Sequence, residues 1–306
     1  MTARCRQAKT GRSTARHLTV LLLSAVCAWT PAKLVAQTPA STRAGTLFIV
    51  GGGAQPAGLV QEFVTRAGGA GTARIVVFAM ASADGARSGE AKAADLRKLG
   101  ASARALWLTR EQANEDSVAA VLRDATGVWF GGGDQNRLAA ILRGTKVERA
   151  IHERFRVGAV VGGTSAGAAV LSYPMITGDE LQRRDSTESW TRIKRGTVQT
   201  DSGFSLLTNA IVDQHFVRRK RHNRLLSLVL ADAPHLGVGI DEGTALIVEP
   251  DGRWRVAGAS AAVIYDARES QRTDAGATVL GATGVRMHVL PAGATFDPRT
   301  GVATLR

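Results

Sequence analysis

The stretch VVGGTSAGAAVL, residues 160–171, predicts a buried strand that turns sharply into a helix. Ser165 stands at this turn, and Gly163 and Gly167 lie two residues to either side, in the G-x-S-x-G pattern of a nucleophile elbow. Such a turn holds the serine in a backbone conformation that tolerates no bulky neighbours. The pattern arises often by chance in a chain with 34 glycines, but its strand–turn–helix context favours a nucleophile whose oxyanion faces the first amides of the helix.

Strands and helices alternate on both sides of this stretch. Short apolar runs predict strands at 46–50, 74–78, 103–108 and 127–130, and helical spacing is found at 59–67, 90–99 and 116–123. Continuous apolar strands with interleaved helices are typical of a parallel sheet covered on both faces, so we expect an α/β fold. After about residue 250, short β-like runs between Gly, Asp and Pro turns predict a β-rich tail on the same domain.

The first 36 residues are predicted to be a secretory signal peptide. Basic residues precede the apolar run 18–29, which is too short to span a bilayer, and Ala36 offers a small residue for cleavage. A tethered N-terminus is the alternative, although Val26 before Cys27 argues against a lipoprotein site. We therefore expect residues 37–306 to form one exported domain, in the periplasm or outside the cell, with no membrane span.

Removal of this leader changes the cysteine count and the charge. Cys5 and Cys27 both lie within it, so we expect no disulfide, thiolate nucleophile or cysteine metal site in the mature chain. The formal net charge falls from +13 to +7, because the leader holds six basic residues and no acidic ones. A charge of +7 on an exported chain weakens the case for nucleic-acid binding and suits an acidic or zwitterionic polymer equally well.

A serine nucleophile needs a base. His215 follows the apolar run 210–212, where a parallel strand would end, and active sites of open α/β sheets gather at such ends. The other histidines of the mature chain fit non-catalytic positions: His152 an exposed helix face, His222 a solvated helix face, His235 a loop and His288 the tail. The sequence therefore favours His215 as the base.

The base needs a carboxylate that orients it. Asp241 and Glu242 end another apolar run and alternate sides of the strand, so only one of them can face the site. The residue types alone do not choose among Glu242, Asp241 and Asp213. The glycine run 51–53 suggests a dinucleotide site, but Pro56 occupies the place of the third fingerprint glycine, so that site is not expected.

Four separated segments resemble the cyanophycinase family, serine exopeptidases related to aspartyl dipeptidases. They are FGGGDQNRL (130–138), GTSAGA (163–168), DQHF (213–216) with the arginines after it, and DEGTA (241–245), in the order and spacing of the family. The resemblance implies a flavodoxin-like sheet similar to that of class I glutamine amidotransferases. It also implies cleavage of the polymer cyanophycin into β-Asp-Arg dipeptides without a metal or organic cofactor, and it suggests a homodimer.

The resemblance also assigns roles by position. It makes Ser165 the nucleophile, His215 the general base and then acid, and Glu242 the group that orients His215. The backbone amides implied to form the oxyanion hole are those of Gly132, Gly133 and Ala166. The implied substrate-binding residues are Gln135, Asp213 and Gln214, for the aspartyl backbone groups, and Arg219, Arg221 and Arg224, for carboxylates that an arginine fork meets bidentately. Asn223, where a glycine is common, and Gly131 depart from the family pattern.

Two other functions compete with a cyanophycinase. One is an aspartyl or isoaspartyl dipeptidase that acts on small peptides. The other is a non-catalytic basic binding protein on the same fold, against which the presence of Ser165, His215 and Glu242 argues. A glutamine amidotransferase would need a cysteine at the position of Ser165.

Overall fold

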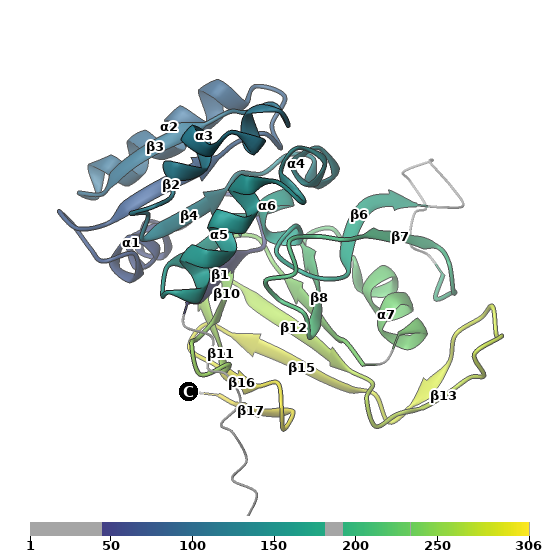
Figure 1. The fold of residues 1–306 in the computed structure, drawn as a ribbon. Coiled ribbons are helices and arrows are strands. Elements are labelled where there is room, and N and C mark those ends of the chain that lie inside the picture. Colours follow the sequence, from purple (N-terminus) through teal and green to yellow (C-terminus); the bar gives the residue numbers. More distant parts are fainter. Residues whose placement is uncertain (1–44, 181–191, 233, 306) are drawn as a thin grey trace, which may run out of the picture. The chain divides into compact units, whose positions relative to one another are not determined.

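The computed structural model describes residues 45–180, 192–232 and 234–305, which all belong to one compact unit of the chain (Figure 1). The predicted signal peptide, residues 1–36, lies outside the described residues. Within the described ranges, no helix is long and apolar enough to cross a membrane.

The described residues form a first sheet of nine strands, in the order β17-β16-β11-β10-β1-β5-β4-β2-β3. Its parallel strands are β1 (Thr46–Val50), β5 (Val160–Thr164), β4 (Gly127–Phe130), β2 (Arg74–Phe78) and β3 (Ser102–Leu106). When the strands are counted along the chain from β2, the order β3-β2-β4-β5 reads 2-1-3-4, which is the first part of the flavodoxin-like order 2-1-3-4-5. The fifth place in this sheet is taken by β1. The predicted parallel α/β architecture is confirmed.

Helices cover both faces of the parallel strands. One face packs on α1 (Ala57–Arg66) and α2 (Gly85–Lys98), whose buried Phe63 and Leu96 share a cluster with Phe48 of β1. The opposite face packs on α3 (Asp116–Ala120), α4 (Gln135–Leu142) and α5 (Lys146–Arg156), and the 3₁₀ helix η1 spans Gln112–Asn114. The apolar stripes of these helices leave their polar residues facing solvent.

A second, six-stranded sheet has the order β15-β12-β9-β8-β6-β7. Its strands are β6 (Met175–Glu180), β7 (Val198–Asp201), β8 (Ala210–Gln214), β9 (Leu236–Ile240), β12 (Ala261–Asp266) and β15 (Arg286–Pro291). Here β6, β8 and β9 run parallel. At the two edges, β7 pairs antiparallel with β6, β12 pairs antiparallel with β9, and β15 pairs antiparallel with β12. The outer face of this sheet packs on α7 (His222–Ala231), which buries Leu225 and Val229 against it.

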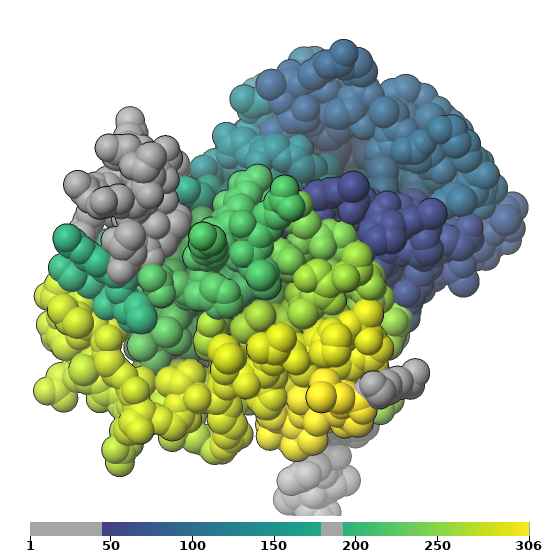
Figure 2. Space-filling model, turned by 180° about the vertical axis from the view of Figure 1, so that it is seen from behind, coloured from purple at the N-terminus to yellow at the C-terminus, as the bar shows by residue number. Residues whose placement is uncertain are grey.

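The C-terminal region is rich in strands, as predicted, but its strands belong to both sheets. The hairpin of β10 (Thr244–Val248) and β11 (Trp254–Gly258) extends the first sheet antiparallel to β1, followed by β16 (Thr295–Asp297) and β17 (Val302–Thr304). A small ribbon pairs β13 (Gln271–Arg272) with β14 (Ala282–Thr283). Figure 2 shows the yellow C-terminal residues packed beside the green residues of the second sheet.

One apolar cluster joins the two sheets. Val212 of β8, Ile240 of β9 and Ile264 of β12 share this cluster with Leu246 and Val256 of the first sheet. The carboxyl ends of β8 and β9 thereby approach the carboxyl ends of β1 and β5, where the short helix α6 (Ala166–Ala169) begins.

Candidate active site

Ser165 stands at a strained turn between β5 and α6. Its φ is 54° and its ψ is −114°, a conformation that L-residues rarely adopt. A Cβ on Gly163 would lie 2.3 Å from the carbonyl oxygen of Gly167, and a Cβ on Gly167 would lie 2.2 Å from that of Phe130. Both glycines of the G-x-S-x-G pattern are therefore required sterically, and the turn has the geometry of a nucleophile elbow.

His215 reaches Ser165 from the end of β8. The strand ends at Gln214, and the backbone of His215 turns into the left-handed region with φ 51°. The Oγ of Ser165 lies 2.8 Å from the Nε2 of His215. His215 is 8% exposed, whereas Ser165 is half-buried, so the base is shielded while the hydroxyl stays partly open to solvent.

Glu242 orients the other side of the imidazole. Its Oε1 lies 2.7 Å from the Nδ1 of His215. Because a carboxylate only accepts hydrogen bonds, Nδ1 must donate, which leaves the lone pair of Nε2 to accept the hydroxyl proton of Ser165. Asp241 faces away, since its carboxylate accepts the backbone N–H of Arg218 at 3.0 Å and the hydroxyl of Ser260 at 2.9 Å.

The glycine run after β1 lies directly against this pair, and the sequence did not reveal its role. A Cβ on Gly52 would lie 2.3 Å from the Cε1 of His215, and a Cβ on Gly53 would lie 2.8 Å from the Oε2 of Glu242. The carbonyl of Gly51 accepts the backbone N–H of His215 at 2.7 Å. Residues 51–53 are thus the backbone surface on which the histidine and its carboxylate rest.

Burial keeps the imidazole neutral. Desolvation lowers the pKa of His215 from its usual value of 6.5, and the positive charges of Arg219 and Arg221 lower it further. The hydrogen bond to Glu242 opposes this effect without reversing it. A neutral imidazole at neutral pH is the state that accepts a proton from a serine.

The predicted oxyanion amides lie beside Ser165. A Cβ on Gly132 would lie 3.4 Å from the Cβ of Ser165, and Ala166 is the next residue of the chain. Within the described part of the chain, the amides of Gly132, Gly133 and Ala166 donate no hydrogen bond to other residues. Asp134 fixes the loop that carries the glycines, because its side chain caps α4 through the amide of Asn136 at 2.8 Å.

Gln135 is buried between α4 and β6. Its Nε2 donates to the carbonyl oxygens of Ile176 at 2.9 Å and Thr177 at 2.6 Å. These two acceptors fix the orientation of the amide, so its Oε1 is the atom turned away from β6. The structure thus holds Gln135 rigidly, 6% exposed, at the start of the helix that follows the oxyanion loop.

Asp213 is fully buried, at 0% exposure, in an ion pair with Arg224. Arg224 donates through Nε to one carboxylate oxygen at 2.7 Å and through Nη2 to the other, and it is 2% exposed. The Oε1 of Gln214 accepts from Arg221 at 2.5 Å and from Arg224 at 3.4 Å. Asp213 and Arg224, implied to bind substrate, thus contact one another, and Arg224 also contacts Gln214.

The other two predicted arginines differ in exposure. Arg219 is exposed in the turn after His215, where its backbone N–H donates to the carbonyl of His215 at 2.9 Å. Arg221 has a 13% exposed side chain and lies 3.5 Å from the carboxylate of Asp213. Burial lowers the pKa of Arg221 to about 10, assisted by the neighbouring charge of Arg224. Arg219 is therefore the most accessible of the three cations.

The two departures from the family pattern lie outside the set of Ser165, His215 and Glu242. A Cβ on Gly131 would make only ordinary contacts, the nearest at 3.5 Å from the carbonyl oxygen of Phe78. Asn223 is the second residue of α7, which begins at His222.

The remaining histidines lie away from Ser165. His152 is on α5 with a side chain 41% exposed, and His235 is in a loop, 3.0 Å from the carboxylate of Asp232. His288, on β15, packs its ring 5.2 Å from the ring of Phe296. The prediction of a solvated His222 is wrong, because its Nδ1 lies 2.8 Å from the Tyr265 hydroxyl and its ring packs on Phe216.

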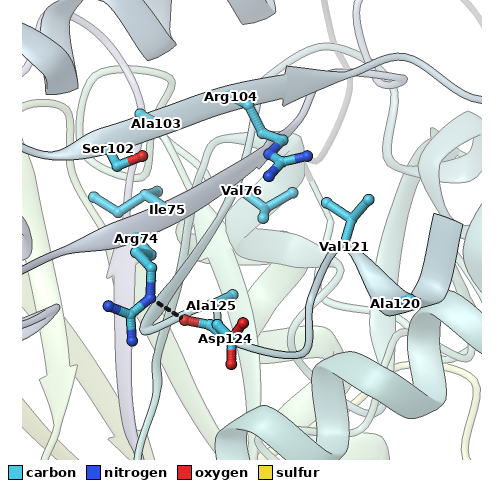
Figure 3. Close-up of a pocket in the computed structure, with 10 residues that line it drawn as sticks. All are labelled: Arg74, Ile75, Val76, Ser102, Ala103, Arg104, Ala120, Val121, Asp124 and Ala125. Atoms are coloured by element: carbon cyan, nitrogen blue, oxygen red, sulfur yellow. Dashed lines mark hydrogen bonds between the residues drawn. The ribbon is translucent and has the colours of Figure 1, made fainter. Parts of the chain in front are cut away.

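A cavity of about 230 Å³ lies at the opposite edge of the first sheet. Its lining includes Arg74 and Ser102, the first residues of β2 and β3, as Figure 3 shows. The Nε of Arg74 donates to the carbonyl oxygen of Asp124 at 2.7 Å, drawn as the dashed line in Figure 3. Since the Ser165 site is at the carboxyl ends of the strands, this cavity is separate from it.

Comparisons with known proteins point to one peptidase family. A sequence profile described as peptidase family S51 matches residues 47–254. Cyanophycinases from Trichormus variabilis and a Nostoc species are each 35% identical over 269 residues, covering 85% of this chain and 87% of theirs. The crystal structure of a peptidase from an acI-B1 actinobacterium aligns with 78% of this chain and 98% of its own, with a TM-score of 0.59 and 24% identity, which supports the fold.

Proposed function

The chain belongs to peptidase family S51 and is a serine-type peptidase, and from this premise we propose that it hydrolyses cyanophycin, the multi-L-arginyl-poly-L-aspartate polymer. The observation that carries the proposal is the hydrogen-bonded line from the Ser165 hydroxyl through His215 to Glu242. The substrate follows from the likeness to cyanophycinases over most of the chain.

The proposed reaction has two steps. His215 takes the proton of Ser165 through Nε2, and the serine oxygen attacks the carbonyl carbon of the scissile amide. His215 then gives the proton to the leaving amine, and the C–N bond breaks to leave an acyl-enzyme ester on Ser165. A water molecule, deprotonated by the same imidazole, hydrolyses this ester and restores the hydroxyl. Glu242 stabilises the imidazolium that forms each time.

The backbone amides beside Ser165 supply electrostatic stabilisation. Each tetrahedral intermediate carries a negative oxygen, and the amides of Gly132, Gly133 and Ala166 are proposed to donate to it. Removal of one such donor typically costs about 3–4 kcal/mol of transition-state stabilisation. Their lack of other acceptors among the described residues supports this role.

The surrounding polar groups suit a substrate that carries both positive and negative charges. Arg219, exposed beside His215, is proposed to bind the carboxylate of an arginyl unit, because a guanidinium pairs with a carboxylate bidentately. The Oε1 of Gln135 is proposed to accept from the aspartyl ammonium. Asp213, Arg221 and Arg224 are proposed to hold Gln214 against the aspartyl backbone. The proposed product is the β-Asp-Arg dipeptide.

The test is incubation of the purified protein with cyanophycin, followed by mass spectrometry for β-Asp-Arg. We expect dipeptide release by the wild type and none by Ser165→Ala, which should keep the fold. Parallel incubations with short α- and β-aspartyl peptides separate a cyanophycinase from a dipeptidase. Turnover of the short peptides with an untouched polymer would refute the polymer as substrate.

We further propose that the chain is exported after cleavage behind Ala36. The support is the basic, apolar and small-residue order of residues 1–36. Expression in a Gram-negative host, followed by N-terminal sequencing of the protein in the periplasm and medium, should find a mature chain that starts at Gln37. Retention of the intact leader in the cytoplasm would contradict this proposal.

A further inference from the structure

Asp241 is a second carboxylate at the end of β9, and the reaction at Ser165 gives it no role. It follows Ile240, the last residue of β9, and it is 9% exposed. The next residue, Glu242, contacts the imidazole of His215. Consecutive residues of an extended chain point to opposite sides, which leaves the carboxylate of Asp241 on the other side of the strand end. A buried carboxylate needs hydrogen-bond donors, so its partners indicate what it does.

The partners of Asp241 come from the turn that follows His215 and from the residue before β12. One carboxylate oxygen, Oδ1, accepts the backbone N–H of Arg218 at 3.0 Å. The other, Oδ2, accepts the hydroxyl of Ser260 at 2.9 Å. Burial would raise the pKa of Asp241, but the N–H of Arg218 and the hydroxyl of Ser260 hold this pKa below its usual value of 3.8. The carboxylate is therefore ionised at neutral pH and accepts both bonds.

The backbone of His215 needs support on both sides because it is strained. Its φ is 51°, in the left-handed region that residues with bulky side chains rarely adopt. Such a conformation persists only where the surrounding structure fixes it. On the N-terminal side, the N–H of His215 donates to the carbonyl of Gly51 at 2.7 Å. On the C-terminal side, the bond from Arg218 to Asp241 holds the turn.

The end of β9 that carries Asp241 is itself firmly held. The backbone N–H of Asp241 donates to the carbonyl of Ala261 in β12 at 3.2 Å, and the carbonyl of Ile240 accepts the N–H of Phe216 at 3.2 Å. A Cβ on Gly51 would lie 2.2 Å from the carbonyl oxygen of Asp241, so the end of β1 packs on the same backbone. The end of β9 is thus a common support for the glycine run 51–53 and for the turn after β8.

We propose that Asp241 is a positioning residue, whose carboxylate holds the turn after His215 at a fixed distance from Glu242 and thereby keeps the imidazole within reach of Ser165. This inference rests on the proposed reaction at Ser165. The two neighbouring carboxylates have separate tasks, because Glu242 fixes the ring of His215 and Asp241 fixes the backbone that carries the ring. Without the carboxylate of Asp241, the N–H of Arg218 loses its acceptor, and the strained turn relaxes and moves the imidazole.

The experiment measures the rate at which a fluorophosphonate labels Ser165, because this reaction needs the activated hydroxyl but no polymer. The purified wild type, Asp241→Ala and Asp241→Asn are compared at neutral pH, well below their unfolding temperatures. The matched control is Asp251→Ala. Asp251 also accepts a backbone N–H in a turn, that of Arg253 at 3.0 Å. Its turn joins β10 to β11 at the end of β10 that pairs with the start of β1, so it lies away from the site.

We expect Asp241→Ala to slow the labelling by about 10²-fold, the effect of a misplacement of about 1 Å in a reacting group. Asp241→Asn should restore most of the rate, because its Oδ1 can accept from Arg218 and its Nδ2 can donate to the Oγ of Ser260. Asp251→Ala should label like the wild type. A purely structural role of Asp241 would lower the unfolding temperature of Asp241→Ala and leave the labelling rate of the folded protein unchanged.

Two results would overturn the inference. One is a wild-type labelling rate in folded Asp241→Ala. The other is equally slow labelling in Asp241→Asn and Asp241→Ala, which would make the charge of Asp241, rather than its hydrogen bonds, the cause. If Asp241→Ala does not fold, Ser260→Ala takes its place, since it removes one of the two donors. Labelling about two- to tenfold slower is then expected, and an unchanged rate overturns the inference.

The same experiment separates this inference from the proposed function. If Ser165 of the wild type is not labelled, the proposed reaction has failed, and the positioning role of Asp241 falls with it. If Ser165 is labelled but cyanophycin releases no dipeptide, the polymer is refuted as substrate, and the comparison of the Asp241 variants still decides the positioning role.

Discussion

A single methyl group on Gly52 should disable the site without altering any polar side chain. The Cβ of Gly52→Ala would lie 2.3 Å from the Cε1 of His215, whereas ordinary contacts begin at 3.4 Å. The imidazole must therefore move by about 1 Å from its position 2.8 Å from the Ser165 hydroxyl. A misplacement of this size in a reacting group costs on the order of 10²-fold in rate.

The assay is kcat for dipeptide release at saturating cyanophycin, with thermal unfolding measured in parallel. The control is Gly252→Ala, since Gly252 also has a positive φ, 84° against 110° for Gly52, and nothing lies within 4 Å of its added Cβ. Both substitutions cost backbone strain of about 1–3 kcal/mol, but only Gly52→Ala should lose activity. Wild-type kcat in a folded Gly52→Ala protein would refute the placement of His215 against the glycine run.

Three further outcomes are expected. His215 must be neutral to act, and its pKa is lowered from 6.5, so kcat/KM should be at its maximum at neutral pH and should fall at pH values below 6.5. A flat profile down to pH 4 would contradict this role. Arg219→Gln removes a positive charge that lowers the pKa of His215, so the acid limb of kcat/KM should move to higher pH. The control Lys220→Gln should leave the acid limb in place. An unchanged acid limb in Arg219→Gln would count against the electrostatic argument. Asp213→Ala leaves Arg224 buried beside an empty position, so chemical denaturation should show a loss of about 3–5 kcal/mol, and unchanged stability would contradict the structural role of the pair.

The elbow was predictable from sequence because its cause is local. Gly163, Ser165 and Gly167 lie within five residues, and the steric demand of the turn appears directly in their order. The parallel strands were equally predictable, because a buried strand appears in the sequence as a short apolar run. The start of α2 at Gly85 was missed, because its first turn packs through glycine rather than through apolar side chains.

The contacts of the site depend on segments that are distant in the chain. Residues 51–53 touch His215 and Glu242 only because β1 lies beside β10 and the second sheet packs on the first. The sequence shows alternation at Asp241 and Glu242 but does not say which carboxylate meets the histidine. Likewise, the apolar runs of β8 and β9 do not reveal that they belong to a second sheet, because burial on both faces looks the same in either sheet.

The charged residues after His215 show the same limit. A run of arginines predicts a solvated or ligand-binding surface, yet Arg224 is buried with Asp213 while Arg219 is exposed. Arg224 is buried because it lies on α7 and pairs with Asp213, eleven residues earlier in the chain. His222 follows the same logic, since its partner Tyr265 comes from β12.

Covalent labelling of the nucleophile tests the central claim most directly. A fluorophosphonate reacts with a serine hydroxyl only where a neighbouring base activates it. Treatment of the folded protein, followed by peptide mass spectrometry, should place one phosphonyl group on Ser165, and His215→Ala should abolish the reaction. A phosphonyl group on another residue, or an unlabelled Ser165 in protein that still releases dipeptide, would contradict the account.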